Sequence, residues 1–339
     1  MITIDGSFGE GGGQILRTSL SLSAITGMAV HFENIRANRP KPGLMRQHLA
    51  CAKAVAEICG GELEGAELNS QQLTLRPGRI QAGDYRFTIG SAGNTLLLAQ
   101  TILPVLLHAD APSTIVLEGG TYTTEAPVYD FFAHAFLPCL RKMGLEVDTT
   151  MEKAGFYPVG GGRVVLSVKP PETWRPLVLQ ERGALRNAWV TAMGCSLRDG
   201  ILSDELTIFQ SLVDGLESFH AKERVVEADG SGNVLLAGLD YENLSELFSV
   251  CGSFSVSRKV VAKRTAGYVR QYLERGWVVG QFLADQLMLP MALGAGGCYV
   301  TGKPTKHSLT NREVIGSFLN AKVKFNQIST ELYEFEVKK

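Results

Sequence analysis

The sequence lacks an excess of charge of either sign. Its 339 residues include 33 Lys and Arg against 34 Asp and Glu, a formal net charge of −1. Counterion release along a long nucleic acid requires a broad positive field, which this composition excludes. Any nucleic-acid role must therefore depend on a local patch, such as a site for one end of a strand.

Cysteine pairs, a leader and a long apolar run are also missing. The six cysteines form no CxxC pair, which argues against a zinc site and a disulfide framework and favours a reducing, cytoplasmic compartment. The N-terminus shows no cationic stretch followed by an apolar core, so no signal peptide is expected. The most apolar segment, residues 95–109, is interrupted by Gln100 and Pro104 and is too short to span a bilayer. It predicts a buried helix and no membrane partner.

Three segments of the chain share one order of elements: a Gly-rich turn, a buried helix, a strand, a loop, an amphipathic helix and two strands. They begin at Gly9, at Gly90 and near Gly280. Their expected first helices are residues 14–24, 95–108 and 281–293, and their next strands are 30–35, 113–118 and 298–300. Any α/β chain looks somewhat repetitive at this resolution, but the helix-ending signals at Gly60, Gly144 and Asn320 fall in matching places.

This order predicts an α/β (α+β) fold with three repeated units, each of two helices on a four-stranded sheet. A length beyond roughly 250–300 residues predicts two domains. We assign residues 1–180 and 276–339 to a catalytic domain and 181–275 to a smaller inserted α/β domain. The insert should contain a helix near 204–221 and a basic helix at 258–274. It carries no visible catalytic motif, which favours a substrate clamp or an assembly surface.

The run FGEGGGQILR, residues 8–17, places glycines before a helix start. Such a turn exposes backbone N–H groups and the positive helix end, which together bind anions. The run does not match GxxxxGK[ST], so a P-loop is excluded. A carboxylate beside phosphates needs a cation between them, which makes Glu10 a candidate ligand for Mg²⁺ or Mn²⁺. A solvated glutamate in an ordinary turn is the alternative and, from this run alone, the favoured one.

Two further loops carry chemistry. The first, residues 36–46, holds Arg36, Arg39, Lys41 and Arg46 together with two prolines that stiffen it, a set suited to phosphate oxygens. The second, GKPTKHSLTN at residues 302–311, holds His307, which can act as a base, a metal ligand or a covalent nucleophile. If the repeats pack around one centre, these loops and the Gly/Pro run at 119–127 meet there. The alternatives are a solvated charge cluster and a structural histidine.

Taken together, the runs GEGGGQILR, RPKPGLMRQHL, GFYPVGGG, LADQLMLPMAL and HSLTN resemble RNA 3′-terminal phosphate cyclases from end to end, inserted domain included. The resemblance implies an ATP-dependent ligase that converts an RNA 3′-phosphate to a 2′,3′-cyclic phosphate with Mg²⁺ or Mn²⁺. It implies that His307 becomes adenylylated and that AMP then passes to the RNA end. RNA 3′-phosphate ends are the implied partner, and a homodimer is left open.

The same resemblance implies a role for each matching residue. Glu10 corresponds to the metal-binding glutamate, and Arg17, Arg36 and Arg39 to arginines near the phosphates. The implied adenosine pocket consists of Gln100, Pro127, Phe282, Asp285 and Gln286. Many relatives have Tyr at the position of Phe282, so stacking is expected to persist without a hydroxyl contact.

Two other functions fit parts of the sequence. One is a non-catalytic relative that acts in ribosome assembly, which the presence of His307, Glu10 and the arginines disfavours. The other is an enolpyruvyl transferase, whose domains repeat a related α/β unit. A single set of three repeats with a long insert disfavours the transferase.

Overall fold

The computed structural model describes residues 1–213, 218–253 and 255–339. Its strands form four mixed sheets of four strands each, which confirms the expected α/β class. In three of these sheets the strands lie in the order first, second, fourth, third along the chain, with the first pair parallel and the other pairs antiparallel. This shared order is the arrangement that three repeated units would produce.

The first sheet has the order β1-β2-β4-β3. Its unit comprises β1 (Ile2–Asp5), α1 (Gly13–Thr26), β2 (Val30–Glu33), α2 (Arg46–Ile58), β3 (Glu62–Glu64) and β4 (Leu73–Arg76). Helix α1 ends at Gly27, whose φ of 72° is the left-handed conformation that glycine adopts without strain.

The second sheet has the order β5-β6-β8-β7. Its unit comprises β5 (Asp84–Thr88), α3 (Thr95–Leu106), β6 (Ser113–Gly119), α4 (Tyr129–Phe131), the π-helical segment η1 (Phe132–Phe136), α5 (Leu137–Lys142), β7 (Glu146–Lys153) and β8 (Gly162–Lys169). The Asn94 side chain caps α3 by accepting a hydrogen bond from the Leu97 N–H.

The third sheet has the order β15-β16-β14-β9. Its unit comprises β9 (Leu177–Leu179), α8 (Gln281–Leu293), β14 (Gly297–Thr301), α9 (Lys306–Phe318), β15 (Lys322–Gln327) and β16 (Tyr333–Lys338). Strand β9 pairs with β14 although about a hundred residues separate them in sequence. The chain therefore leaves this unit after its first strand and returns to it at α8.

The intervening segment forms the fourth sheet, with the order β11-β10-β12-β13. It comprises β10 (Leu185–Cys195), α6 (Ile201–Val213), β11 (His220–Val225), β12 (Gly232–Tyr241), β13 (Ser245–Cys251) and α7 (Arg258–Arg275). Among the residues described, the buried apolar side chains fall into two clusters, and the smaller one is drawn almost entirely from this segment. The main cluster also includes Met193, Val234 and Leu236 of this sheet, and the domain bounds 181–275 stay a prediction.

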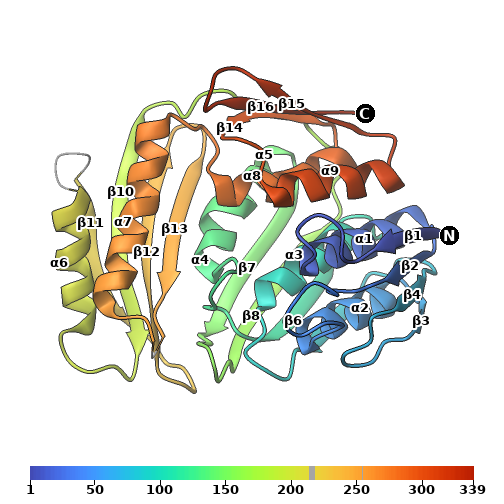
Figure 1. The fold of residues 1–339 in the computed structure, drawn as a ribbon, viewed down its shortest axis with the longest axis horizontal. Helices are drawn as coiled ribbons and strands as arrows, with labels where there is room; N and C mark the ends of the chain where they lie inside the picture. The colour runs from blue at the N-terminus through green and yellow to red at the C-terminus, as the bar shows by residue number, and fades with distance from the viewer. Residues whose placement is uncertain (214–217, 254) are drawn as a thin grey trace.

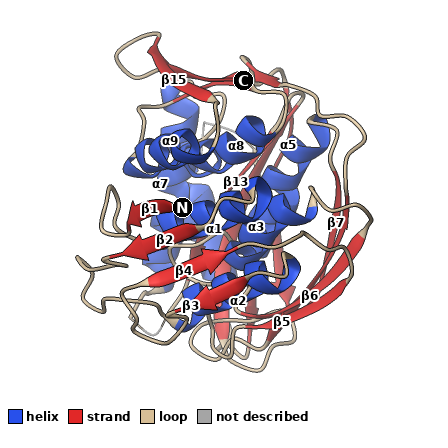
Figure 2. Ribbon diagram, turned by 90° about the vertical axis from the view of Figure 1, so that its right-hand side faces the viewer, coloured by secondary structure: helices blue, strands red, loops and turns tan. Residues whose placement is uncertain are grey.

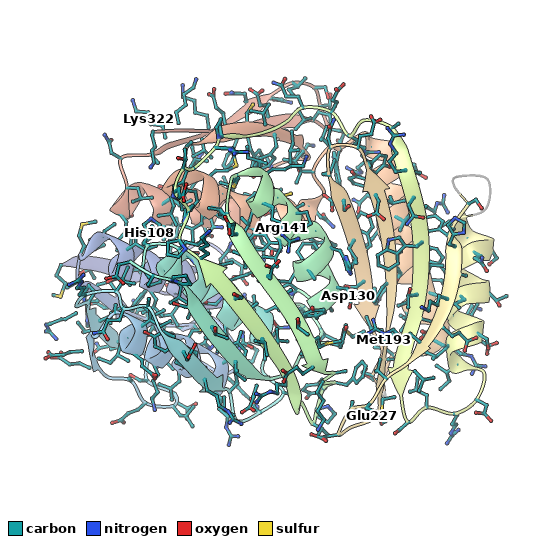
Figure 3. The ribbon with its side chains drawn as sticks, turned by 180° about the vertical axis from the view of Figure 1, so that it is seen from behind. His108, Asp130, Arg141, Met193, Glu227 and Lys322 are labelled. Atoms are coloured by element: carbon teal, nitrogen blue, oxygen red, sulfur yellow. The ribbon has the colours of Figure 1, made fainter. Side chains whose placement is uncertain are left out.

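The figures show how the units pack. Helices α1, α3, α8 and α9 lie together in the centre, and the first three sheets pack around them (Figure 2). The insert stands beside them, with α6 and α7 covering one face of its sheet (Figure 1). Asp130 of α4 lies at the junction between the sheet of β7 and β8 and the insert (Figure 3). The ends of the central helices and the wall of the insert therefore face one another.

Some expected elements differ from the structure. His307 lies in the first turn of α9, not in a loop, because the Thr305 hydroxyl caps the helix by accepting a hydrogen bond from the Ser308 N–H. The helix expected over 204–221 is described as α6 up to Val213, residues 214–217 fall outside the part described, and His220 and Ala221 begin β11. Strands β1, β5, β9 and β13 were not anticipated.

Candidate active site

His307 is held at the start of α9 by Gln14, the second residue of α1. The Nδ1 atom of His307 lies 2.5 Å from Gln14 Oε1. The amide nitrogen of Gln14 donates to Asp285 Oδ2 at 3.2 Å, so the amide oxygen must face the histidine. A carbonyl oxygen only accepts, so in the neutral ring Nδ1 carries the proton and Nε2 has the lone pair. The side chain is 49% exposed, which leaves the ring open to a reacting group.

The carboxylate of Asp285 lies inside the protein on α8. Burial raises its pKa to about 6, although His307, Gln14 and Arg17 act in the opposite direction. The Asp285 carbonyl accepts a hydrogen bond from Asn311 Nδ2 at 2.9 Å, and Asn311 Oδ1 accepts one from the Thr18 hydroxyl at 3.0 Å. These bonds tie α1, α8 and α9 together, so the position of His307 is fixed by three helices.

Glu10 lies in the glycine turn beside His307. One carboxylate oxygen pairs with Arg39 Nη2, and the other lies 3.9 Å from His307 Nδ1. The backbone N–H of Glu10 donates to the Thr310 hydroxyl at 3.3 Å. The preceding Gly9 has a φ of 64° and packs directly against Thr310, so a side chain there would be strained and would clash. The glycine turn is thus fitted to α9.

The predicted arginines occupy different places. Arg39 reaches the glycine turn, where Nη2 also donates to the Glu10 carbonyl at 3.1 Å. Arg36 donates to the carbonyls of Lys41 and Gly43 at 2.6 and 3.0 Å, within its own loop. Its pKa is lowered, first by burial and then by Arg39 nearby. The structure therefore brings Arg39 to Glu10, whereas Arg36 braces the loop that carries Arg39.

Arg17 and His48 lie beneath the glycine turn. Burial lowers the pKa of Arg17, but a guanidinium remains charged. The pKa of His48 is lowered to about 3 by burial and by the charges of Arg17 and Arg36. Its Nδ1 accepts a hydrogen bond from the Met45 N–H at 3.2 Å. A neutral His48 leaves Arg17 as the positive charge at this end of α1.

A cleft of about 1050 Å³ opens in front of His307. It is lined by Glu10, Arg17 and all five residues predicted for the adenosine pocket: Gln100, Pro127, Phe282, Asp285 and Gln286. Gln100 of α3 donates a hydrogen bond to Gln286 of α8. Phe282 is 40% exposed, and its ring offers an apolar surface to the cleft. Arg36 and Arg39 do not line the cleft itself.

Several residues of the site were not predicted from the sequence. Gln14 and Asn311 lie within the runs GEGGGQILR and HSLTN, but their bonds to His307 and Asp285 join segments far apart in sequence. Arg264 and Tyr268 of α7 also line the cleft, so the insert forms part of its wall. The Tyr268 ring meets the Phe282 ring edge-on, with centroids 5.1 Å apart.

The described residues contain no group of three or more His, Cys, Asp and Glu side chains placed to hold a metal ion. None of the helices described is long and apolar enough to cross a membrane.

A mixed α/β protein with a histidine, an acidic glycine turn and arginines at or beside one cleft is suited to binding phosphorylated ligands. The sequence model of the RNA 3′-terminal phosphate cyclase family matches residues 8–325 of this chain. The chain therefore belongs to that family. At the level of the family, this is a cyclase-type enzyme of RNA processing that acts on RNA ends.

Proposed function

We propose that the protein uses ATP and a divalent cation to convert an RNA 3′-phosphate end into a 2′,3′-cyclic phosphate. The observation that carries the proposal is the hydrogen bond from His307 Nδ1 to Gln14, which in the neutral ring leaves the lone pair on Nε2 of a histidine that lines the cleft. Nucleophilic catalysis by histidine requires such an unprotonated nitrogen. A cytoplasmic location and a homodimer remain predictions.

The reaction would proceed in three displacements at phosphorus. First, His307 Nε2 attacks the α-phosphorus of ATP, a P–N bond forms, and the bond to the β-phosphate oxygen breaks to release pyrophosphate. Second, an oxygen of the RNA 3′-phosphate attacks the same phosphorus, which breaks the P–N bond and gives RNA(3′)pp(5′)A. Third, the terminal 2′-hydroxyl loses its proton and attacks the 3′-phosphorus, and AMP leaves. Adenylylation is needed because a phosphate monoester dianion is a poor electrophile.

The residues at the cleft have matching roles in this scheme. Positive charge that develops on the ring of His307 faces the Gln14 carbonyl oxygen and the Glu10 carboxylate. Arg17 would bind phosphate oxygens and offset the charge of the transition state. Gln100, Pro127, Phe282 and Gln286 would receive adenosine, through apolar surface and amide groups. The carboxylate of Asp285 binds Gln14, which favours a positioning role for it.

Glu10 is the residue that would hold Mg²⁺ or Mn²⁺. Magnesium in such sites usually takes one or two carboxylates together with substrate phosphates, so a single glutamate in an anion-binding turn fits. The ion would neutralise phosphate charge beside the carboxylate.

Intact-protein mass spectrometry after incubation with ATP and Mg²⁺ tests the proposal. Wild-type protein should gain the mass of one AMP, and His307→Ala should gain none. AMP on the variant would remove His307 from its role. Well-folded wild-type protein that gains nothing would favour the non-catalytic relative.

A further inference from the structure

The insert contributes a positively charged side chain to the cleft. Among the described residues that line it, the arginines are Arg17 and Arg264, and no lysine lines it. Arg17 lies on α1, near Glu10 and Asp285. Arg264 lies on α7, on the side of the cleft that the insert forms. A phosphate group in the cleft that does not reach Arg17 has Arg264 as its arginine partner.

Arg264 is free to bind a ligand, unlike its neighbours on the same helix. Arg258 pairs with Asp204, Arg270 with Glu274 and Arg275 with Glu331. Arg264 is exposed and has no ion pair with any residue that the structure describes. The same holds for two exposed lysines in the first half of α7, Lys259 and Lys263. In a chain of net charge −1, three unpaired cations on one helix form a local positive patch.

Tyr268 follows Arg264 by four residues, so the two side chains are neighbours on one face of α7. Both line the cleft. A cation next to a partly exposed aromatic ring is the combination that binds single-stranded nucleic acid, because the cation pairs with a phosphate and the ring stacks on a base.

The cleft is large and reaches the insert. Its volume of about 1050 Å³ lies at the upper end of the range for a pocket that encloses one drug-sized molecule, roughly 300–1000 Å³. The proposed second displacement requires the RNA end to reach His307 while AMP is still attached to it. Adenosine takes the side of the cleft nearest Gln100, Pro127 and Gln286 in that scheme. The wall formed by α7 remains, and it meets the adenosine side where the Tyr268 ring contacts Phe282.

We propose that α7 of the insert binds the RNA strand next to its 3′-phosphate end. Arg264 pairs with a phosphodiester, Tyr268 stacks on a base near the end, and Lys263 and Lys259 attract the phosphates upstream. This assignment rests on the proposed function, and it makes the insert the element that presents RNA to the adenylylated histidine.

The test separates the two substrates, because the first displacement needs ATP alone. Enzyme–AMP formation is measured by intact-protein mass. RNA of about ten nucleotides with a 3′-phosphate is then added, and AMP transfer is measured as the loss of AMP mass from the enzyme. Arg264→Ala and Arg264→Glu should form enzyme–AMP at the wild-type rate, and Tyr268→Ala is compared with its own rate of enzyme–AMP formation because the Tyr268 ring contacts Phe282. The RNA concentration for half-maximal transfer should rise about tenfold in the two alanine variants and further in Arg264→Glu. Arg270→Ala, which loses a charge paired with Glu274, is the matched control and should change neither step.

Each other result overturns the assignment. Unchanged RNA dependence in all three variants, with normal enzyme–AMP formation, would show that the strand does not contact α7. A raised ATP requirement for enzyme–AMP formation, with unchanged RNA dependence, would place Arg264 and Tyr268 in the ATP site. Wild-type protein that forms no enzyme–AMP would instead refute the proposed function, on which the assignment depends. Circular dichroism of each variant establishes that it is folded.

Discussion

His307 depends on Gln14 for its reactive form. The amide is buried, with its oxygen on His307 Nδ1 and its nitrogen on the Asp285 carboxylate, so its orientation is fixed at both ends. Without this amide, His307 Nδ1 loses its hydrogen-bond acceptor, and the Asp285 carboxylate loses a side-chain donor. Gln14 is therefore a positioning residue, comparable to the outer groups that orient the ligands of a metal.

We accordingly expect Gln14→Leu to slow enzyme–AMP formation roughly 10–100-fold, a loss typical of such orienting groups. The effect should fall on the maximal rate and leave the half-saturating ATP concentration within about twofold, because Gln14 orients the nucleophile. Single-turnover assays at varied ATP measure both quantities. Gln72→Leu, at an exposed glutamine, is the control. A loss confined to ATP affinity would contradict the positioning role.

Glu10 offers a second prediction for a single residue. Its carboxylate is 21% exposed in a surface turn, so Glu10→Ala should leave the protein folded. If the carboxylate is a metal ligand, the Mg²⁺ or Mn²⁺ concentration for half-maximal enzyme–AMP formation should rise about tenfold or more. Metal titrations of wild type, Glu10→Ala and the exposed control Glu67→Ala give the comparison. An unchanged metal requirement would exclude Glu10 as a ligand.

At the scale of elements, Glu246 links the insert to helix α8. It lies on β13, is 2% exposed, and accepts a hydrogen bond from the Gly280 N–H at the start of α8 at 2.6 Å. Burial raises its pKa to about 8, against the opposing effects of Gly280 and Arg182. Because α8 carries Asp285 and Gln286, this bond connects the insert to the floor of the cleft.

The raised pKa of Glu246 predicts the sign of a pH effect. Between the usual glutamate pKa and about 8, the unfolded chain has lost the proton and the folded chain keeps it. The folded state then binds more protons, so the free energy of unfolding falls as pH rises through this window, by up to about 1.4 kcal/mol per pH unit. Glu246→Gln keeps an acceptor for Gly280 without ionising. Its melting temperature should therefore fall less than that of wild type between about pH 5 and pH 8.

Thermal melts across that range provide the test, with Glu172→Gln at an exposed position as control. Other groups that titrate contribute to wild type and variant alike, so the difference between the two curves isolates Glu246. Parallel curves would mean that Glu246 titrates normally in the folded protein.

The elements show what the sequence could and could not predict. Long periodic helices were placed within one or two residues, as for 281–293, which is α8, and 95–108, where α3 ends at Leu106. Strands β1 and β9 have only four and three residues, too few for a pattern to stand out. The Thr305 cap that puts His307 on a helix is a local signal that we did not use. The wall formed by α7 had no local signal, because the cleft arises only when the insert packs beside α8.

At the scale of the whole molecule, few positive charges are associated with the cleft. The net charge is −1, and the arginines associated with the cleft or its glycine turn are Arg17, Arg36, Arg39 and Arg264. An RNA can therefore contact few phosphates, all close to the end that reacts. The insert extends the binding surface by the length of one helix and no further.

This distribution predicts how RNA binding depends on length and salt. Affinity for 3′-phosphorylated single strands should rise over the first few nucleotides and then level off. With about three phosphates neutralised, the logarithm of the association constant should fall with the logarithm of salt concentration with a slope near −2. Fluorescence anisotropy with strands of increasing length, each at several salt concentrations, measures both. The same strands with a 3′-hydroxyl lack the terminal phosphate. They should bind more weakly, and their association constant should depend less steeply on salt. Affinity that kept rising with length, or a slope steeper than about −5, would require a long basic track, which the charge distribution of this protein does not provide.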